Sequence, residues 1–197
     1  VRFVHITDLH LGAIRSKRFL ARMVKRVNDL SPDALLITGD TFDGSGNPDK
    51  RMVAGFKYLK PKTFAILGNH DAYIGSDLAD KLLQEHMTVL RGDVTSFKGV
   101  QLAGLDCPDN AHWKKPEPKM LKLKVDKHKP LVLLYHTPNG LQEAKSIGTD
   151  LMLCGHTHNG QLVPMNLFVW QFFKYVHGLY HLDAMRLFVS CGLGTWG

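Results

Sequence analysis

Two histidines, His156 and His158, stand two residues apart in the stretch Cys154–Gln161, which reads CGHTHNGQ and follows the apolar run at 151–154. Imidazole nitrogens bind divalent metals and exchange protons near neutral pH. Glycines on both sides of the pair let the backbone turn sharply without a Cβ in the way. The stretch therefore predicts a bend that presents both imidazoles to ligands.

Polar side chains of the same kinds follow four other apolar runs, at the point where each run ends. They are Asp8 and His10 after 1–6, Asp40 after 34–38, Asn69, His70 and Asp71 after 63–67, and His136 after 131–135. One such group alone is often a simple turn residue. Five successive groups are not explained in that way. Because the carboxyl ends of strands form the ligand crevice of an α/β sheet, we expect these residues to converge there.

The elements that would position these groups alternate between short apolar runs and helical patterns, which is typical of an α/β protein. Besides the runs above, 186–190 is an expected strand, and glycine-punctuated alternation over 88–105 predicts antiparallel strands. Helices are expected to begin near Ser16, Pro48, Ser76 and Leu141. Residues 108–118 are expected to form a polar loop.

The chain of 197 residues is long enough to bury a sizeable core, and no repeat or linker divides it. We therefore expect a single domain over 1–197. The net charge of +7 favours an anionic partner. Nucleic acid is not favoured, because the basic residues are scattered, and nothing predicts a protein partner. The cysteines at 107, 154 and 191 are expected to be buried apolar residues rather than disulfide or zinc ligands.

Two features of the chain bear on whether the protein is attached to a membrane. No uncharged run reaches 18 residues, and the chain begins without Met, directly in a strand-like run. We expect a trimmed form of the protein, from which a targeting segment has been removed. The apolar, aromatic segment at 162–176 has two interpretations. The favoured one is packing against the core, and the alternative is an exposed lip that rests on a bilayer or grips an acyl chain.

The motif string D-x-H, G-D, G-N-H-D, H and G-H-x-H, which runs from Asp8 to His158, resembles that of the calcineurin-like metallophosphoesterases. The resemblance implies an α/β fold, a four-layer α/β/β/α sandwich of two mixed sheets flanked by helices. It also implies an enzyme, a dinuclear-metal-dependent phosphohydrolase. Such an enzyme cleaves a phosphoester or pyrophosphate bond by attack of a metal-bridging hydroxide.

The same resemblance implies a set of ligands for two divalent metal ions. Asp40 would bridge them, with Asp8, His10 and His158 completing one site and Asn69, His136 and His156 the other. Nitrogen and oxygen ligands without a thiolate suit manganese, iron or zinc better than magnesium or calcium, and manganese is favoured.

Two further residues of the motif string are expected to be catalytic. By resemblance, His70 is not a ligand but faces the phosphate, where it stabilises charge or protonates the leaving group. Asp71 would orient the His70 ring, and its alternative role is a carboxylate at a helix start. Asp43 fits either a hydrogen bond to a ligand or a simple turn.

Within the superfamily, the runs DLHLG at 8–12, GHTHNGQ at 155–161 and GLGTWG at 192–197 resemble bacterial members that are membrane-associated or exported. Some of these act on UDP-2,3-diacylglucosamine, which implies a phosphorylated small-molecule or lipid-linked substrate and a membrane surface nearby; a cytoplasmic location is the alternative. Asn159 replaces a usual glycine, and it would either narrow the pocket mouth or occupy a left-handed turn. A nuclease or cyclic nucleotide phosphodiesterase, and a non-catalytic scaffold of the same fold, stay open as other functions.

Overall fold

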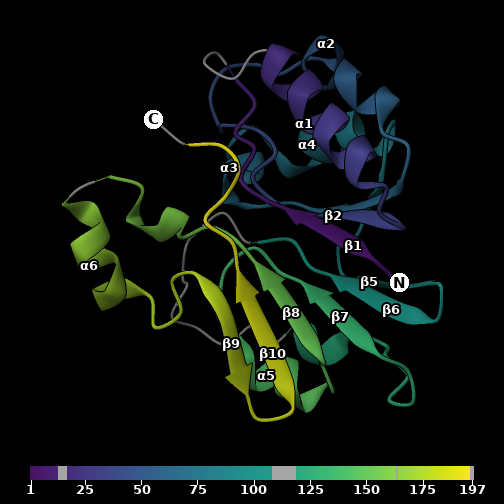
Figure 1. Ribbon diagram of the computed structural model, residues 1–197, viewed down its shortest axis with the longest axis vertical. Helices are drawn as coiled ribbons and strands as arrows, with labels where there is room; N and C mark the ends of the chain where they lie inside the picture. The colour runs from purple at the N-terminus through teal and green to yellow at the C-terminus, as the bar shows by residue number, and fades with distance from the viewer. Residues whose placement is uncertain (13–16, 108–118, 163, 196–197) are drawn as a thin grey trace.

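The computed structural model describes residues 1–12, 17–107, 119–162 and 164–195. Two predicted features, the Ser16 helix start and the polar loop at 108–118, lie outside these residues. Figure 1 shows two stacked sheets, with helices above the upper sheet and others behind the lower one. No helix among the described residues is long and apolar enough to cross a membrane.

The first sheet has four strands in the order β1-β2-β3-β4, and all of its pairings are parallel. Its strands are β1 (Phe3–Ile6), β2 (Ala34–Thr38), β3 (Lys62–Ile66) and β4 (Thr88–Val89). The helices that connect them are α1 (Lys17–Leu30), α2 (Lys50–Val53), the 3₁₀ helix η1 (Ala54–Tyr58), α3 (Asn69–Tyr73) and α4 (Ser76–Gln84). The predicted apolar stripe of α1 faces inward, because Leu20, Met23, Val24 and Val27 are buried.

The second sheet is mixed, with six strands in the order β5-β6-β7-β8-β10-β9. Its strands are β5 (Asp93–Phe97), β6 (Val100–Gly104), β7 (Leu131–Leu134), β8 (Leu151–Cys154), β9 (Gly178–Leu182) and β10 (Met185–Val189). Its other elements are the 3₁₀ helices η2 (Met120–Lys122) and η3 (His158–Gly160) and the helices α5 (Leu141–Ser146) and α6 (Met165–Phe172).

Three apolar clusters hold the layers together. One lies between the two sheets and includes Leu36 and Ile66 from the first and Leu134 from the second. A second cluster joins α1, η1 and α4 to the outer face of the first sheet, and a third packs η2 and α5 on the second sheet. The predicted four-layer α/β/β/α sandwich is therefore confirmed.

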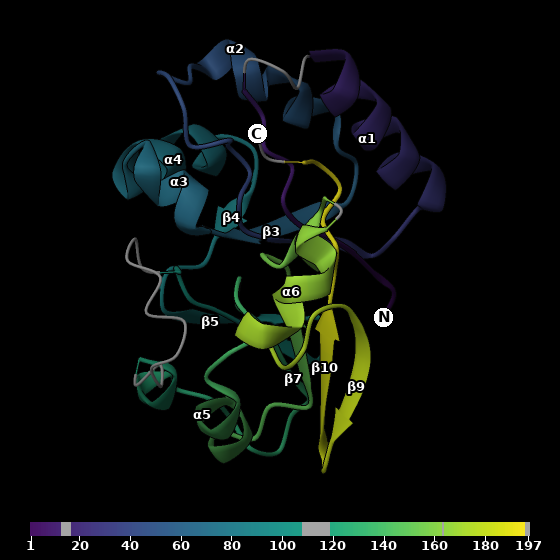
Figure 2. The ribbon, with the colours of Figure 1, turned by 90° about the vertical axis from the view of Figure 1, so that its left-hand side faces the viewer.

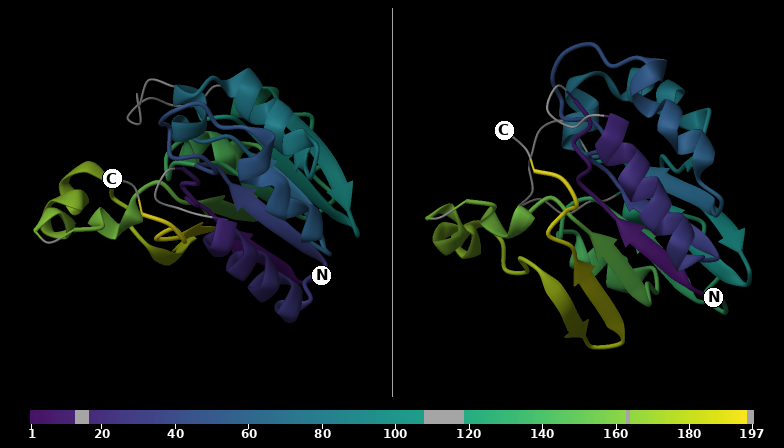
Figure 3. Two further views of the ribbon diagram at one scale, coloured as in Figure 1. Left: turned by 90° about the horizontal axis from the view of Figure 1, so that it is seen from above. Right: turned by 45° about the horizontal axis from the view of Figure 1, so that its top comes forward.

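The structure corrects several predictions about individual segments. The antiparallel prediction for 88–105 holds for β5 and β6, but β4 pairs in parallel with β3. Strand β9 was not predicted. Cys191 is exposed, whereas Cys107 and Cys154 are buried as expected. The favoured core packing of 162–176 is wrong for α6, which projects from the sandwich (Figures 1 and 3) and exposes more than half of the Leu167 and Trp170 side chains.

Candidate metal centre

The predicted site residues follow strands of both sheets. Strands β1, β2 and β3 precede the segments that contain Asp8, Asp40 and Asn69, and strands β7 and β8 precede His136 and the pair His156 and His158. The segments after these strands approach one another so closely that a Cβ at Gly155 would lie 2.2 Å from Asp8 Oδ2. Glycine is required at that position by this contact between the two sheets.

Asp8, His10 and His158 form the first group of candidate ligands. The His158 Nε2 lies 3.1 Å from Asp8 Oδ1 and 3.1 Å from His10 Nε2. Asp8 is held in place from its other side, because the Thr7 hydroxyl and the His156 amide both donate hydrogen bonds to Oδ2, at 2.7 and 3.1 Å. The three ligand atoms lie close enough together to share one metal ion.

Asp40, His136 and His156 form the second group. The two carboxylate oxygens of Asp40 have different neighbours. Oδ1 accepts a hydrogen bond of 2.9 Å from the His70 amide. Oδ2 lies 3.2 Å from His136 Nε2 and 3.8 Å from His10 Nε2, so Asp40 stands between the two groups.

Buried polar atoms without a hydrogen bond mark this cluster as one that fits metal ions. Among the described residues, Asn69 Oδ1 and His136 Nε2 are buried and have no hydrogen-bond partner. An unsatisfied polar atom costs free energy unless a ligand completes it. His136 donates from Nδ1 to the Thr38 carbonyl at 2.7 Å, so Nε2 is the nitrogen that would bind a metal once its proton is displaced. The donor set therefore fits divalent cations bound by nitrogen and oxygen.

His70 lies beside both groups, and together with His10 and Asp40 it forms a third set of side chains close enough to hold a metal ion. Its Nδ1 donates a hydrogen bond of 2.7 Å to the Asp43 carbonyl, and its ring meets the His10 ring edge to face at 4.7 Å between centroids. Asp71 was expected to orient this ring, but its carboxylate accepts hydrogen bonds from the amides of Phe42 and Gly68. The residue that orients His70 through a hydrogen bond is therefore Asp43, through its backbone.

The buried carboxylates and imidazoles shift one another's pKa values. Burial raises the pKa of Asp8, but hydrogen bonds from His10 and His158 outweigh it and hold that pKa well below its ordinary value. Burial lowers the pKa of His136, but Asp40 and Asp8 outweigh it and raise it to about 10. Burial and the neighbouring His136 lower the pKa of His156 to about 4, which keeps its ring neutral, the form that binds metals. Burial and Asp40 raise the pKa of Asp71 to about 7.

Five of the candidate ligands have a left-handed backbone. They are Asp8, His10, Asp40, His156 and His158, with φ between 47° and 72°. This conformation is unfavourable for residues with a side chain and is concentrated at functional sites. No residue pattern predicts this conformation. Asn159 is also left-handed, at φ 51° and ψ 32°, which confirms the turn interpretation of that residue.

A pocket of about 440 Å³ opens beside the candidate ligands. Its polar floor contains Asp40, His70, His156 and His158, and its apolar wall is formed by Leu162, Val169, Phe172 and Phe173. The Phe173 ring lies edge-on to the His156 ring, 5.6 Å between centroids. Sequence reasoning singled out the apolar segment but not which of its residues face the site.

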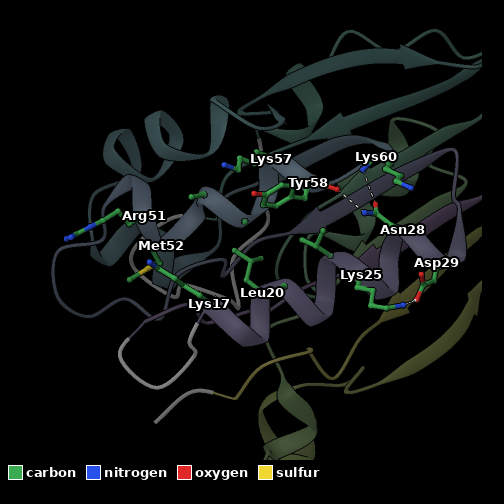
Figure 4. A pocket seen from close by; sticks show the side chains of 14 residues that line it. Lys17, Leu20, Lys25, Asn28, Asp29, Arg51, Met52, Lys57, Tyr58 and Lys60 are labelled. Atoms are coloured by element: carbon green, nitrogen blue, oxygen red, sulfur yellow. Dashed lines mark hydrogen bonds and ion pairs between the residues drawn. The ribbon is translucent and has the colours of Figure 1, made fainter.

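A second, larger pocket of about 780 Å³ lies between α1 and η1 (Figure 4). None of its described lining residues is a candidate ligand. Two of its polar groups are paired. Asn28 donates to the Tyr58 carbonyl at 2.8 Å and accepts from the Lys60 amide at 2.9 Å. Lys25 pairs with Asp29 at 2.7 Å. We call this pocket the α1–η1 groove.

Comparison with known proteins finds metallophosphoesterases among the similar chains. The chain is 33% identical over 205 residues to a metallophosphoesterase of Helicobacter pylori, covering 100% of this chain and 55% of that protein. It is 24% identical over 259 residues to LpxG, a UDP-2,3-diacylglucosamine pyrophosphatase of Chlamydia muridarum, covering 100% of this chain and 78% of that protein. The chain thus spans only about half the length of the first curated relatives it matches.

Solved structures and a family model agree with these relatives. The protein TT1561 of Thermus thermophilus superposes with a TM-score of 0.61 at 18% identity, over 96% of this chain and 88% of the other. That likeness concerns the fold. The family model for calcineurin-like phosphoesterase matches residues 1–160, which include all of the candidate ligands. The chain therefore belongs to the calcineurin-like phosphoesterase family.

Proposed function

We propose that this domain is a metal-dependent phosphohydrolase that cleaves a phosphoester or pyrophosphate bond in a lipid-linked substrate. The observation that carries the proposal is the convergence of two groups of candidate ligands on either side of Asp40. The apolar wall over those ligands supports a substrate with an acyl or similar chain. LpxG, which is named for a lipid-linked substrate, supports the same choice.

Two divalent cations are the cofactor that this arrangement suits. Asp8, His10 and His158 would hold one, Asn69, His136 and His156 the other, and Asp40 would contact both. When bound, the cations supply Lewis-acid polarisation of the phosphoryl group and activation of water. The mixed nitrogen and oxygen donors suit manganese, iron or zinc, and manganese is our first choice.

His70 and Asp71 have different roles in this proposal. His70 lines the pocket, and because its Nδ1 is occupied by Asp43, its Nε2 is the nitrogen that would face the phosphoryl oxygens. There it stabilises charge or gives a proton to the leaving oxygen. Asp71 is a positioning residue, because its carboxylate ties the segment after β2 to the segment after β3.

A nuclease or a cyclic nucleotide phosphodiesterase would use the same ligands but a different wall. Such enzymes need basic side chains along the nucleic acid or polar contacts to the base. The described lining of the pocket contains no Lys or Arg. The non-catalytic scaffold is disfavoured because every residue of the motif string is present.

The test is hydrolysis of an aryl phosphodiester by the chain, first stripped with a chelator and then given Mn²⁺. We expect turnover only with metal, and a fall of about 100-fold or more in His70→Ala with the bound metal unchanged. The matched control is His128→Ala, at an exposed histidine away from the motifs. A lack of metal-dependent turnover by the unaltered chain would refute the proposal.

The choice of substrate needs a second measurement. We expect UDP-2,3-diacylglucosamine or a phospholipid to be cleaved with a higher kcat/KM than cyclic AMP or single-stranded DNA. If the nucleotide substrates are preferred, the lipid-linked part of the proposal fails while the metal chemistry stands.

A further inference from the structure

Helix α6 presents apolar side chains to solvent. Leu167, Phe168, Trp170 and Phe172 are 46–69% exposed, and Leu162, just before the helix, is 62% exposed. The helix sequence MNLFVWQF contains no charged residue. Scattered exposed apolar residues are common on proteins, but a contiguous group of this kind indicates a surface that binds something.

The exposed residues do not form the single stripe of an ordinary surface helix. At about 100° per residue, Leu167 and Trp170 lie about 60° apart around the axis, and Phe168 lies about 100° from Leu167 on its other side. Only Val169 among the described side chains of α6 is buried. A helix that is apolar around most of its circumference is at home in a core or in contact with lipid. The described protein core does not cover α6.

The helix is held in a fixed place beside the metal centre. Its main packing partner is η3, which contains His158. The segment after the helix is held by a hydrogen bond of 2.5 Å, which the Thr157 hydroxyl donates to the carbonyl of the buried Val176. Figure 2 looks directly onto α6, which lies in front of the level where the two sheets meet. Phe172, the last residue of the helix, and Phe173, which follows it, also line the pocket.

We propose that α6 is an interfacial helix that seats the domain on an anionic phospholipid bilayer, with the pocket mouth facing the lipid headgroups. Eight residues make a helix of about 12 Å, too short to cross a hydrocarbon core of about 30 Å. Aromatic side chains, and Trp above all, favour the membrane–water interface. The net charge of +7 and the exposed Lys174 directly after the helix select an anionic surface. This inference deepens the proposed function. It rests on that function only where it orients the pocket toward a substrate.

The test is co-sedimentation of the chain with vesicles of phosphatidylcholine containing phosphatidylglycerol. We expect binding, weakened by high salt and by pure phosphatidylcholine vesicles. The variant Leu167→Ser/Trp170→Ser should lose about tenfold or more of its partition coefficient, because two exposed apolar side chains no longer enter the interface. The matched control is Tyr58→Ser, which removes a side chain that is 65% exposed in the α1–η1 groove and should bind as the unaltered chain does.

A second readout follows Trp170 itself. With Trp113 and Trp196 replaced by Phe, the emission of Trp170 should shift to shorter wavelength when vesicles are added. Failure of the chain to sediment with vesicles, or equal sedimentation of the Leu167→Ser/Trp170→Ser variant, would overturn the proposal. A homodimer that forms in solution, does not bind vesicles and is abolished by this variant would also overturn the proposal. Helix α6 would then be a contact between two copies of the chain.

The outcome also separates this inference from the proposed function. Leu167 and Trp170 do not line the pocket, so the variant should hydrolyse a soluble aryl phosphodiester within about twofold of the unaltered rate. Vesicle binding without metal-dependent turnover would refute only the proposed function. Turnover without vesicle binding would refute only the role of α6.

Discussion

The metal-centre pocket and the α1–η1 groove both have apolar walls, but they differ in how their polar atoms are satisfied. In the groove, which is the larger at about 780 Å³ against about 440 Å³, Asn28 is hydrogen bonded on both sides. At the metal centre, Asn69 Oδ1 and His136 Nε2 are buried without a hydrogen bond. Volume therefore does not identify the site in this molecule. Converging polar atoms that lack partners do.

The largest expected difference between the two pockets comes from the same substitution made in each. Asp40→Asn removes the negative charge that lies between the two ligand groups. We expect it to lower metal affinity and turnover by about 100-fold or more, a larger effect than the loss of a residue that only hydrogen bonds a ligand. Asp29→Asn, in the groove, should leave both unchanged. Isothermal titration with Mn²⁺ and steady-state kinetics measure this. Equal effects in both pockets would remove the distinction between them.

A second prediction concerns acid and a histidine that lines neither pocket. His5 on β1 donates or accepts a hydrogen bond with Thr38 Oγ1 at 2.7 Å, and burial, opposed by Asp8, lowers its pKa from 6.5 to about 4. The folded state therefore takes up the proton later than the unfolded state as pH falls. The contribution of neutral His5 to stability is complete above pH 6.5 and is lost between about 6.5 and 4. The groove contains no histidine among its described lining residues.

Urea unfolding in the presence of chelator tests this at pH 7.5 and 4.5. The unaltered chain should lose about 2 kcal/mol more free energy of unfolding between these pH values than His5→Gln does, after allowance for partial exposure of the ring. If both proteins lose the same amount, acid sensitivity arises from other groups.

In the groove, the expected effect is on stability alone. Asn28→Ala leaves the Lys60 amide and the Tyr58 carbonyl without their partner. We expect a loss of about 1–2 kcal/mol in the free energy of unfolding. Turnover at the metal centre should not change. A fall in kcat beyond twofold would show that the groove acts on the site and would break the contrast between the two pockets.

The smallest effect is expected at Asn159. Its left-handed backbone suits glycine at least as well as asparagine, and the residue does not line the pocket. Asn159→Gly should change stability by less than about 0.5 kcal/mol and leave KM unchanged. A raised or lowered KM would restore the idea that this side chain narrows the pocket mouth.

Strand ends were the part of the molecule that sequence predicted best. The length of the apolar runs before Asp40 and His136 predicts strands that end just before those residues. The structure has β2 and β7 at these positions. Asp8 and His158 lie 150 residues apart in sequence, yet the packing of the two sheets brings His158 Nε2 to 3.1 Å from Asp8 Oδ1.

Contacts made by backbone atoms were not predictable in this way. The Asp43 carbonyl that binds His70 depends on how the segment after β2 folds, and a residue's type says little about where its carbonyl points. Helix α6 was assigned to the core because apolar residues are usually buried, a rule that does not identify the apolar residues that lie on the surface. Strand β9 was missed because exposed and half-buried residues alternate along it without a strong apolar run.

The candidate ligands come from both sheets of the sandwich, with Asp8 and Asp40 after strands of one and His136 and His158 after strands of the other. Bound cations would therefore act as cross-links between two layers that are otherwise joined mainly by apolar packing. Because such binding occurs only in the folded state, it adds to the free energy of unfolding. The end of the sandwich that holds the reaction would also be the end that resists opening, so metal supply would set the lifetime of the fold as well as its activity.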